Sequence, residues 1–187
     1  MPGQRRADAQ RNRTRILETA VAALTEGEAL SLNAVAKRAG VGVGTVYRQF
    51  PTPEALVLAV YEHEAQDLVD AVPALLRRYE PPDAFRVWVT EHLAHYMATK
   101  RGLARALQAA GNDGHDGVFD KIAQAVAGLI DANVTAGAIR ADVEARTVLR
   151  ALSGLIMLKS DGDRRTESVK LVDLLWQGMR NQNTQGD

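Results

Sequence analysis

The chain has 187 residues, of which 46% are hydrophobic and 25% charged, and its formal net charge is zero. This length and composition predict a globular protein of one large domain or two small ones, and the absence of cysteine excludes disulfides and thiolate chemistry. The polar, basic N-terminus lacks the apolar region of a signal peptide, and no apolar run is long enough to span a membrane. We therefore expect a soluble, cytoplasmic protein.

The charge is distributed unevenly along the chain. Residues 1–50 contain 8 Lys or Arg and 4 Asp or Glu, whereas residues 51–187 contain 15 and 19. A basic N-terminal segment suits contact with a polyanion, and it is equally typical of a solvated tail. Helical spacing of apolar residues starts at Ile16 and ends near Gly27, so we expect the basic residues before Ile16 to be disordered in the free protein.

The next segment predicts two short helices with a glycine turn between them. Ser31 is placed to cap a helix over residues 32–39, and Gly40 follows at the position where a left-handed residue ends a helix. A third helix covers about residues 43–49, and Thr52-Pro53 provides a cap and a first-turn proline for a longer helix.

From about residue 81 the apolar patterns lengthen. They predict a helix over PPDAFRVWVTEHLAHYMAT, a separate short helix over RGLARALQAA, another over about residues 118–135, and two final helices over VEARTVLRALSGLIMLK and RTESVKLVDLLWQGMR. No strand or internal repeat is evident. The predicted fold is all-α with about nine helices, divided into residues 1–52 and 53–187.

The glycines of GVGVG raise the possibility of a loop that holds a nucleotide phosphate. The dinucleotide pattern G-x-G-x-x-G fails, because its last position is Thr45 or Tyr47, depending on the register. The phosphate loop also fails, because the chain contains no Gly-Lys pair. The segment that precedes the glycines reads as helix and not as the strand that such loops follow.

Residues 32–39, 40–42 and 43–49 instead have the lengths of a helix-turn-helix, whose second helix enters the DNA major groove. Small residues at its start let the backbone approach DNA, hydroxyl groups can donate to phosphates, and an arginine can reach a phosphate or a guanine. A glutamine can read adenine or face solvent, and the tyrosine can alternatively belong to the core. The residues concerned are Gly42, Val43, Gly44, Thr45, Tyr47, Arg48 and Gln49.

At these residues the sequence resembles the N-terminal signature of TetR-family transcriptional regulators. The resemblance covers about residues 11–60 and depends on the ordered combination of ILETA, AVAKRAGV, GTVYRQF and PEAL. It implies a three-helix DNA-binding head, a connecting fourth helix and a helical body that binds a ligand and dimerises. It also implies that Val43, Gly44 and Arg48 lie against bases, that Ser31 contacts a phosphate, and that Thr45, Tyr47 and Gln49 lie on the DNA backbone or at the groove edge.

Two positions depart from the family pattern. Gly42 stands where the family often has Ser or Thr as a helix cap, and Pro53 stands where it often has a lysine that binds phosphate. Basic residues of the N-terminal tail can replace that contact by reaching phosphates or the minor groove. These residues are Arg5, Arg6, Arg11, Arg13 and Arg15.

The resemblance implies that the central helices of the body enclose a small apolar or amphipathic effector. Aromatic side chains mixed with His and Tyr suit an apolar cavity with a few polar anchors, although for each residue alone plain core packing is the simpler interpretation. The candidates are Phe85, Trp88, His92, Tyr96, Leu103, Phe119, Ile122 and Met157. His92 and His95, with Glu91 beside them, could bind a metal ion, but two histidines three residues apart are a weak motif and the chain has no cysteine to support them. We therefore expect no metal and no cofactor.

The last two predicted helices carry apolar stripes that must be buried, either within one chain or against a second copy. The resemblance favours a homodimer with a two-fold four-helix interface, formed by Leu149, Leu152, Ile156, Leu171, Leu175 and Met179. Two heads would then meet the half-sites of an approximately palindromic operator, about 34–36 Å apart.

The function that follows is a dimeric DNA-binding transcriptional regulator, taken to be a repressor that a small molecule releases from its operator. A helical enzyme is the first alternative, but the sequence offers no Ser/His/Asp set, cysteine nucleophile or metal triad. A ligand-independent interaction protein is the second. The sequence does not decide between repressor and activator.

Overall fold

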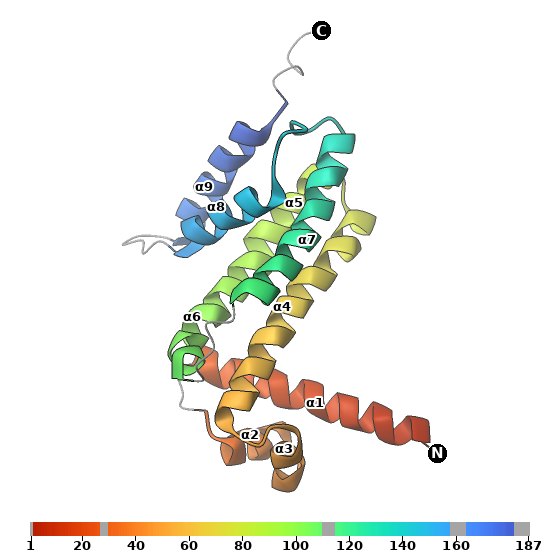
Figure 1. Cartoon of the computed structure of the whole chain (residues 1–187), viewed down its shortest axis with the longest axis vertical. Coiled ribbons are helices and arrows are strands. Elements are labelled where there is room, and N and C mark those ends of the chain that lie inside the picture. The colour runs from red at the N-terminus through yellow and green to blue at the C-terminus, as the bar shows by residue number, and fades with distance from the viewer. Residues whose placement is uncertain (1, 27–29, 110–114, 158–163, 182–187) are drawn as a thin grey trace. The chain divides into compact units, whose positions relative to one another are not determined.

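The computed structural model describes residues 2–26, 30–109, 115–157 and 164–181, and this part of the chain is almost entirely helical (Figure 1). Its only extended pairing is an isolated bridge between Ile139 and Arg180, so the predicted all-α class is confirmed. The elements are α1 (Pro2–Thr25), α2 (Leu32–Ala39), α3 (Val43–Gln49), α4 (Pro53–Arg78), α5 (Pro81–Val87), the π-helix η1 (Trp88–Leu93), α6 (Ala94–Ala109), α7 (His115–Thr135), α8 (Ala145–Met157) and α9 (Arg164–Met179).

These helices form two compact units. The first contains Met1–Glu64 and Ala98–His115, and the second contains Ala65–Met97 and Asp116–Asp187. The helices α4 and α6 each begin in one unit and end in the other.

The first three helices bury their apolar faces against one another. Apolar residues three and four apart line one side of α1 and α2, as amphipathic helices require, and each buried aliphatic or aromatic side chain contributes roughly 1.5–3 kcal/mol. Arg38 of α2 also forms a bidentate ion pair with Glu26, at 2.9 and 3.0 Å. The buried side chains are Ile16, Leu17, Ala20, Leu24, Leu32, Val35, Ala36, Val46 and Phe50.

Helix α1 begins much earlier than the apolar pattern indicates, and the expectation of a disordered basic tail is wrong for the described residues. The helix starts at Pro2, fourteen residues before Ile16, the first side chain that the structure describes as buried. Pro is well tolerated in a first helical turn, and pairs three apart, Arg11 with Asp8 and Arg15 with Asn12, bridge neighbouring turns. These turns form without a core, which is why periodicity gives no sign of them.

The helix ends follow the local sequence closely. Gly40 adopts φ 64° and ψ 35°, its N–H donates to the carbonyl of Lys37, and the N–H of Val41 donates to that of Ala36. This is the Schellman pattern, which satisfies the last carbonyls of α2 and requires a left-handed residue. Gly137 ends α7 in the same way at φ 71°.

The segment from Pro81 to Ala109 is one continuous helical run, because η1 joins α5 to α6 without a break. The prediction of a separate short helix over RGLARALQAA is therefore wrong, since residues 101–109 are the end of α6. With this run counted once, the described residues form eight continuous helices, close to the predicted nine. A π-helical turn inserts an extra residue into the helical repeat and shifts the phase of the apolar pattern.

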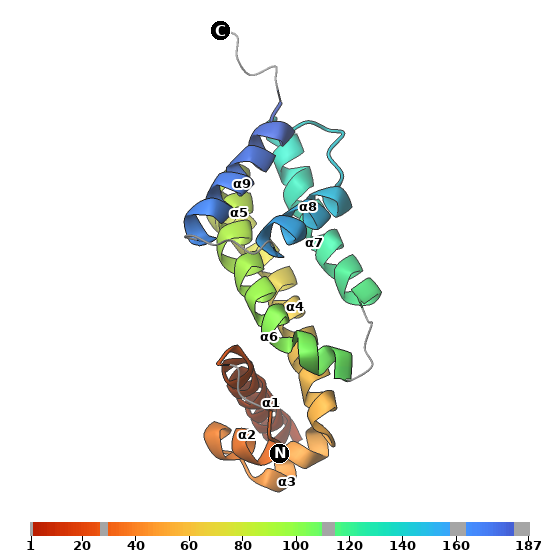
Figure 2. The same ribbon diagram turned by 90° about the vertical axis from the view of Figure 1, so that its left-hand side faces the viewer.

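In the second unit, α9 packs against η1 and α8, and α8 and α9 lie side by side in Figures 1 and 2. The Phe85 and Trp176 rings lie 5.3 Å apart, and Arg86 pairs with Asp173 at 3.1 Å. The C-terminal end of α9 is tied to the loop after α7, because the N–H of Arg140 donates to the carbonyl of Met179 at 3.0 Å. These contacts fix α9 beside α8 and leave a groove between them.

Candidate functional site

Helix α3 presents one side to solvent and the other to the core of the first unit. Val46 is fully buried, whereas Val43 and Tyr47 are 45% and 46% exposed, and Gly44 and Arg48 are also exposed. At 100° per residue, these four exposed positions fall within one arc of the helix. Two large apolar side chains left in solvent on a short helix are typical of a binding surface.

The remaining predicted DNA-contact residues lie at the edges of this arc. Ser31 and Gly42 are exposed, and Thr45 and Gln49 are half-buried. The sequence alone also allows Tyr47 a place in the core, and its exposure argues against that role. Ser31 accepts the N–H of Ala34 at 3.5 Å and so caps α2.

The start of α3 differs from the starts of its two neighbours. Ser31 caps α2 and Thr52 caps α4, where its hydroxyl oxygen accepts the N–H of Ala55 at 3.2 Å. The cap of α3 is Gly42, which offers no side-chain hydrogen bond. The first N–H groups of α3 are therefore left for solvent or for another molecule.

The first turn of α4 contains a negatively charged side chain, the Glu54 carboxylate. The backbone N–H of Glu54 and then the hydroxyl of Thr52 donate to the Glu54 carboxylate, which lowers the pKa of this carboxyl below its ordinary value of 4.5. Pro53 has no N–H, and Ala55 donates to Thr52. The first turn of α4 thus holds a carboxylate that stays ionised at neutral pH, at the point where the family often has a lysine that binds phosphate.

We expect Glu54→Gln to strengthen DNA binding roughly 2- to 5-fold at low salt, the size of an interaction between exposed charges. The substitution removes a negative charge from beside the helix-turn-helix, and the gain shrinks as salt screens that charge. Fluorescence anisotropy with duplex DNA at several salt concentrations measures it. Glu62→Gln is the matched control, because Glu62 is exposed about 12 Å further along the same helix. Weaker binding by Glu54→Gln would contradict the expectation.

The N-terminal arginines of α1 have partners within the head. Arg11 pairs with Asp8, and Arg15 donates to Asn12 at 2.6 Å. The Arg13 guanidinium lies 4.8 Å from the centre of the Phe50 ring, which follows α3. This cation–π contact joins α1 to the end of α3 and contributes about 0.5–1 kcal/mol if exposed. The side chains of Arg5 and Arg6 lie outside the described residues.

Most of the predicted effector residues are buried. Phe85, Trp88, Tyr96, Leu103 and Ile122 are at most 5% exposed. Leu103 belongs to the first unit, whereas the other four belong to the second.

The other three predicted effector residues have different surroundings. His92 and Phe119 are half-buried, and the guanidinium groups of Arg146 and Arg150 lie 5.2 and 5.5 Å from the centre of the Phe119 ring. The side chain of Met157 lies outside the described residues.

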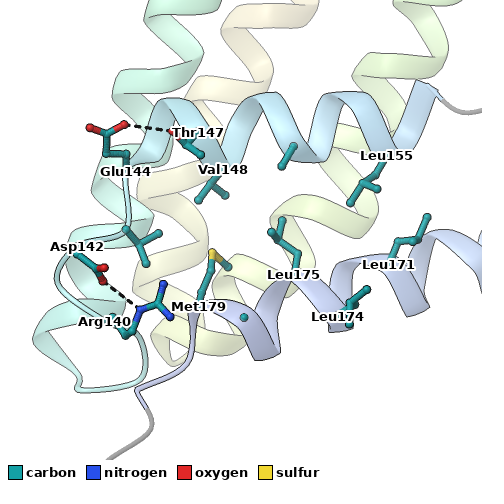
Figure 3. Close-up of a pocket in the computed structure, with 13 residues that line it drawn as sticks. Arg140, Asp142, Glu144, Thr147, Val148, Leu155, Leu171, Leu174, Leu175 and Met179 are labelled. Atoms are coloured by element: carbon teal, nitrogen blue, oxygen red, sulfur yellow. Dashed lines mark hydrogen bonds and ion pairs between the residues drawn. The ribbon is translucent and has the colours of Figure 1, made fainter.

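A groove of about 690 Å³ lies between α8 and α9 (Figure 3). Leu155 of α8 lies across it from Leu171 and Leu175 of α9, and the ion pair of Arg140 with Asp142 lies at one end. None of the predicted effector residues lines this groove, but three of the predicted dimer residues do. The lining residues are Arg140, Asp142, Val143, Glu144, Thr147, Val148, Ala151, Leu155, Leu171, Leu174, Leu175, Gly178 and Met179.

The apolar stripe of α8 is divided between the core and the groove. Leu149 and Leu152 are 2% and 0% exposed and do not line the groove, so they pack within the chain. The apolar α8 side chains that reach the groove are Val148, Ala151 and Leu155. On α9, Leu174 is 70% exposed and is the most exposed large apolar side chain among the described residues. The side chain of Ile156 lies outside them.

A glycine turn that leads into a short, half-exposed helix on a three-helix core defines a helix-turn-helix DNA-binding protein. Two family models match the chain. The model described as bacterial regulatory proteins, tetR family, matches residues 16–60, and the model described as transcriptional regulator SbtR-like, C-terminal domain, matches residues 80–181. The chain belongs to the TetR family of transcriptional regulators, which are DNA-binding proteins and not enzymes.

Solved structures agree with this assignment. The TetR transcriptional regulator SCO0520 from Streptomyces coelicolor is 38% identical, with a TM-score of 0.80 over 91% of this chain and 99% of its own. The TetR regulatory protein from Mycobacterium vanbaalenii is 34% identical, with a TM-score of 0.77 over 94% and 99%. A γ-butyrolactone receptor (ArpA-like protein) shares the fold at 18% identity, with a TM-score of 0.62 over 94% and 92%. No curated protein matches the chain.

Within the described ranges, no three His, Asp or Glu side chains come close enough together to hold a metal ion. Glu91, His92 and His95 therefore do not form such a group with any described neighbour. No described helix is both long and apolar enough to cross a membrane.

Proposed function

We propose that this TetR-family regulator is a homodimer that represses transcription from an approximately palindromic operator. The groove between α8 and α9 is the observation that supports the dimer, because Leu174 is 70% exposed there beside Leu171 and Leu175. Exposed apolar patches of this kind mark surfaces that another molecule covers. A second copy that presents the same two helices would cover it by two-fold symmetry.

In this proposal the exposed arc of α3 enters the major groove. Val43, Gly44 and Arg48 face base edges, and the DNA backbone is contacted by Ser31, Gly42, Thr45, Tyr47 and Gln49. The exposure of Val43, Tyr47 and Arg48 in the free chain supports this assignment. Two heads in one dimer would read half-sites about 34–36 Å apart, one helical turn of DNA.

The basic first turns of α1 supply further phosphate contacts in this proposal. A helix is stiffer than a disordered tail, so we propose that it contacts the phosphate backbone and does not enter the minor groove as a flexible arm. Residues 1–15 contain five Arg and one Asp. This charge would attract DNA without regard to its base sequence.

We expect the combined substitution of Arg5, Arg6 and Arg11 by Ala to weaken binding to all duplexes alike. The slope of log affinity against log salt should fall by about 0.9 for each phosphate that the variant no longer neutralises. Titrations of one specific and one unrelated duplex over a range of salt concentrations measure both effects. Arg77→Ala, an exposed arginine of the second unit, is the control. An unchanged slope would show that these arginines do not bind phosphate.

We further propose that residues 53–187 bind a small apolar or amphipathic effector and that residues 1–52 bind DNA in the cytoplasm. The match of the family's C-terminal domain to residues 80–181 supports this division. The effector would act by population shift, since it can change DNA affinity only by as much as its own affinities for the two conformers differ.

The test uses the full chain and duplex DNA from upstream of its own gene. Gel-shift titration should give a complex with two chains per duplex, and Tyr47→Phe should weaken it by removing one hydroxyl donor. Compounds that raise the protein's melting temperature are then added to the complex. Release of DNA by one of them supports an effector-controlled repressor, whereas DNA binding that no stabilising compound alters would contradict effector control and leave the DNA-binding function standing.

A further inference from the structure

The Arg48 side chain runs back along α3 toward the start of the helix. Its Nη2 donates to the Thr45 hydroxyl oxygen at 3.3 Å, and a Cβ on Gly44 would lie 4.0 Å from its Nη1. The side chains of an α-helix tilt toward its N-terminus, which brings the guanidinium beside the first turn although Arg48 belongs to the last. In helix-turn-helix proteins this N-terminal part of the second helix contacts base edges.

Neither the backbone conformation nor the packing of the free chain requires glycine at position 44. Its φ is not positive, since Gly40 and Gly137 are the described residues with positive φ. Apart from its chain neighbours and the backbone of its own helix, the only described atom within 4 Å of the position that a Cβ would take is Arg48 Nη1, at an ordinary contact distance of 4.0 Å. Glycine inside a helix costs about 0.5–1 kcal/mol relative to alanine. A residue that weakens its helix and is required by no neighbouring packing indicates a functional constraint.

The Arg48 guanidinium keeps most of its hydrogen-bonding capacity. Among the described residues, its one hydrogen-bond partner is the neutral Thr45 hydroxyl, and it has no carboxylate partner. Arginine has five N–H donors in a planar fork, so the bond to Thr45 leaves a pair of parallel donors available. Such a pair matches the O6 and N7 acceptors of guanine in the major groove.

We propose that Arg48 reads a guanine in each operator half-site, and that Thr45 is the positioning residue that holds its guanidinium at the start of α3. Thr45 holds one side of the guanidinium by accepting a hydrogen bond from Nη2. This inference rests on the proposed entry of α3 into the major groove. It gives Thr45 a role in base recognition in addition to the backbone contact proposed above.

The experiment selects binding sequences from a randomised pool of double-stranded DNA with the full-length protein and with four variants. Arg48→Ala removes the guanidinium, and Arg48→Lys keeps the positive charge without the paired N–H donors. Thr45→Val removes the hydroxyl acceptor, and Thr45→Ser restores it. Each protein is then titrated against the selected duplex and against duplexes with one half-site base pair replaced. The salt dependence of binding is measured in parallel to detect a loss of charge alone, and circular dichroism is measured to detect a loss of folding.

We expect one guanine per half-site that the wild type prefers by about 5- to 140-fold, the range for a bidentate arginine contact. Arg48→Ala and Arg48→Lys should lose this preference, and Arg48→Lys should keep the salt slope. Thr45→Val should reduce the preference about 2- to 10-fold, the value of one hydrogen bond, and Thr45→Ser should recover it.

The contrary outcomes separate this inference from the proposed function. If the wild type selects no common motif, the operator function fails and the inference fails with it. If it selects a motif in which Arg48→Lys keeps the full guanine preference, or in which the position sensitive to Arg48 is not guanine, only the reading by Arg48 is overturned. A Thr45→Val protein with undiminished preference overturns the positioning role of Thr45.

Discussion

If the proposed dimer closes over the α8–α9 groove, Leu174→Glu should convert it into a monomer and reduce the affinity for operator DNA by about a hundredfold or more. Leu174 is 70% exposed in the single chain, so a carboxylate at this position faces water and leaves the folding of the chain intact. In a dimer closed over the α8–α9 groove the same carboxylate would be buried without a partner, which costs several kcal/mol per charge. Two-fold symmetry would bury two such charges.

The DNA affinity falls because a single head holds only one half-site. Joining two heads makes the second contact intramolecular, and this raises the overall affinity by about 10²- to 10⁴-fold without any new contact. Sedimentation velocity at micromolar protein measures the oligomeric state, and anisotropy with operator DNA measures the affinity.

The control for this prediction is Gln177→Glu, which places the same charge on an exposed residue of α9 that does not line the groove. It should leave both the dimer and DNA binding unchanged. If Leu174→Glu remains dimeric, the two chains associate through another surface. If it becomes monomeric but binds the operator as before, the two heads do not act together.

The features that can be predicted from the sequence are those that local chemistry determines. Gly40 ends α2 and Ser31 caps it, as the sequence predicts, because a left-handed glycine and a side-chain acceptor act within a few residues of their own positions. The helix-turn-helix follows from the same local signals. The exposure of Val43 and Tyr47 is implied by the family resemblance and agrees with the structure.

The features that could not be predicted depend on contacts between distant segments or on helices without a core. The first turns of α1 carry no apolar stripe, so periodicity could not detect them. On α8, Val148, Leu149, Ala151, Leu152 and Leu155 are all apolar. A stripe this wide does not reveal which edge packs within the chain and which lines the groove. Leu152 is buried within the chain and Leu155 lines the groove, and this difference is visible only once α9 is placed beside α8.

Trp88→Ala should lower the stability of the protein by about 3–5 kcal/mol, the usual cost of removing a large buried aromatic side chain. Trp88 is completely buried, and its indole N–H donates to the carbonyl of Leu68 in α4 at 3.0 Å. The substitution removes this bond and leaves a cavity between η1 and α4. For a chain of this size each kcal/mol corresponds to about 2–4 °C, so we expect Tm to fall by roughly 6–20 °C. Thermal unfolding followed by circular dichroism measures it.

The matched control is Trp176→Ala, which removes the same side chain from a half-buried position beside Phe85. Because part of that ring is already in water, its loss should lower Tm less than the loss of Trp88. The comparison also separates the two roles that the sequence allows for Trp88. A residue that lines an open effector cavity has fewer atoms packed against it, and its truncation leaves the unliganded protein nearly as stable. If Trp88→Ala melts at the wild-type temperature, Trp88 lines a cavity, and the effector site must be sought around η1.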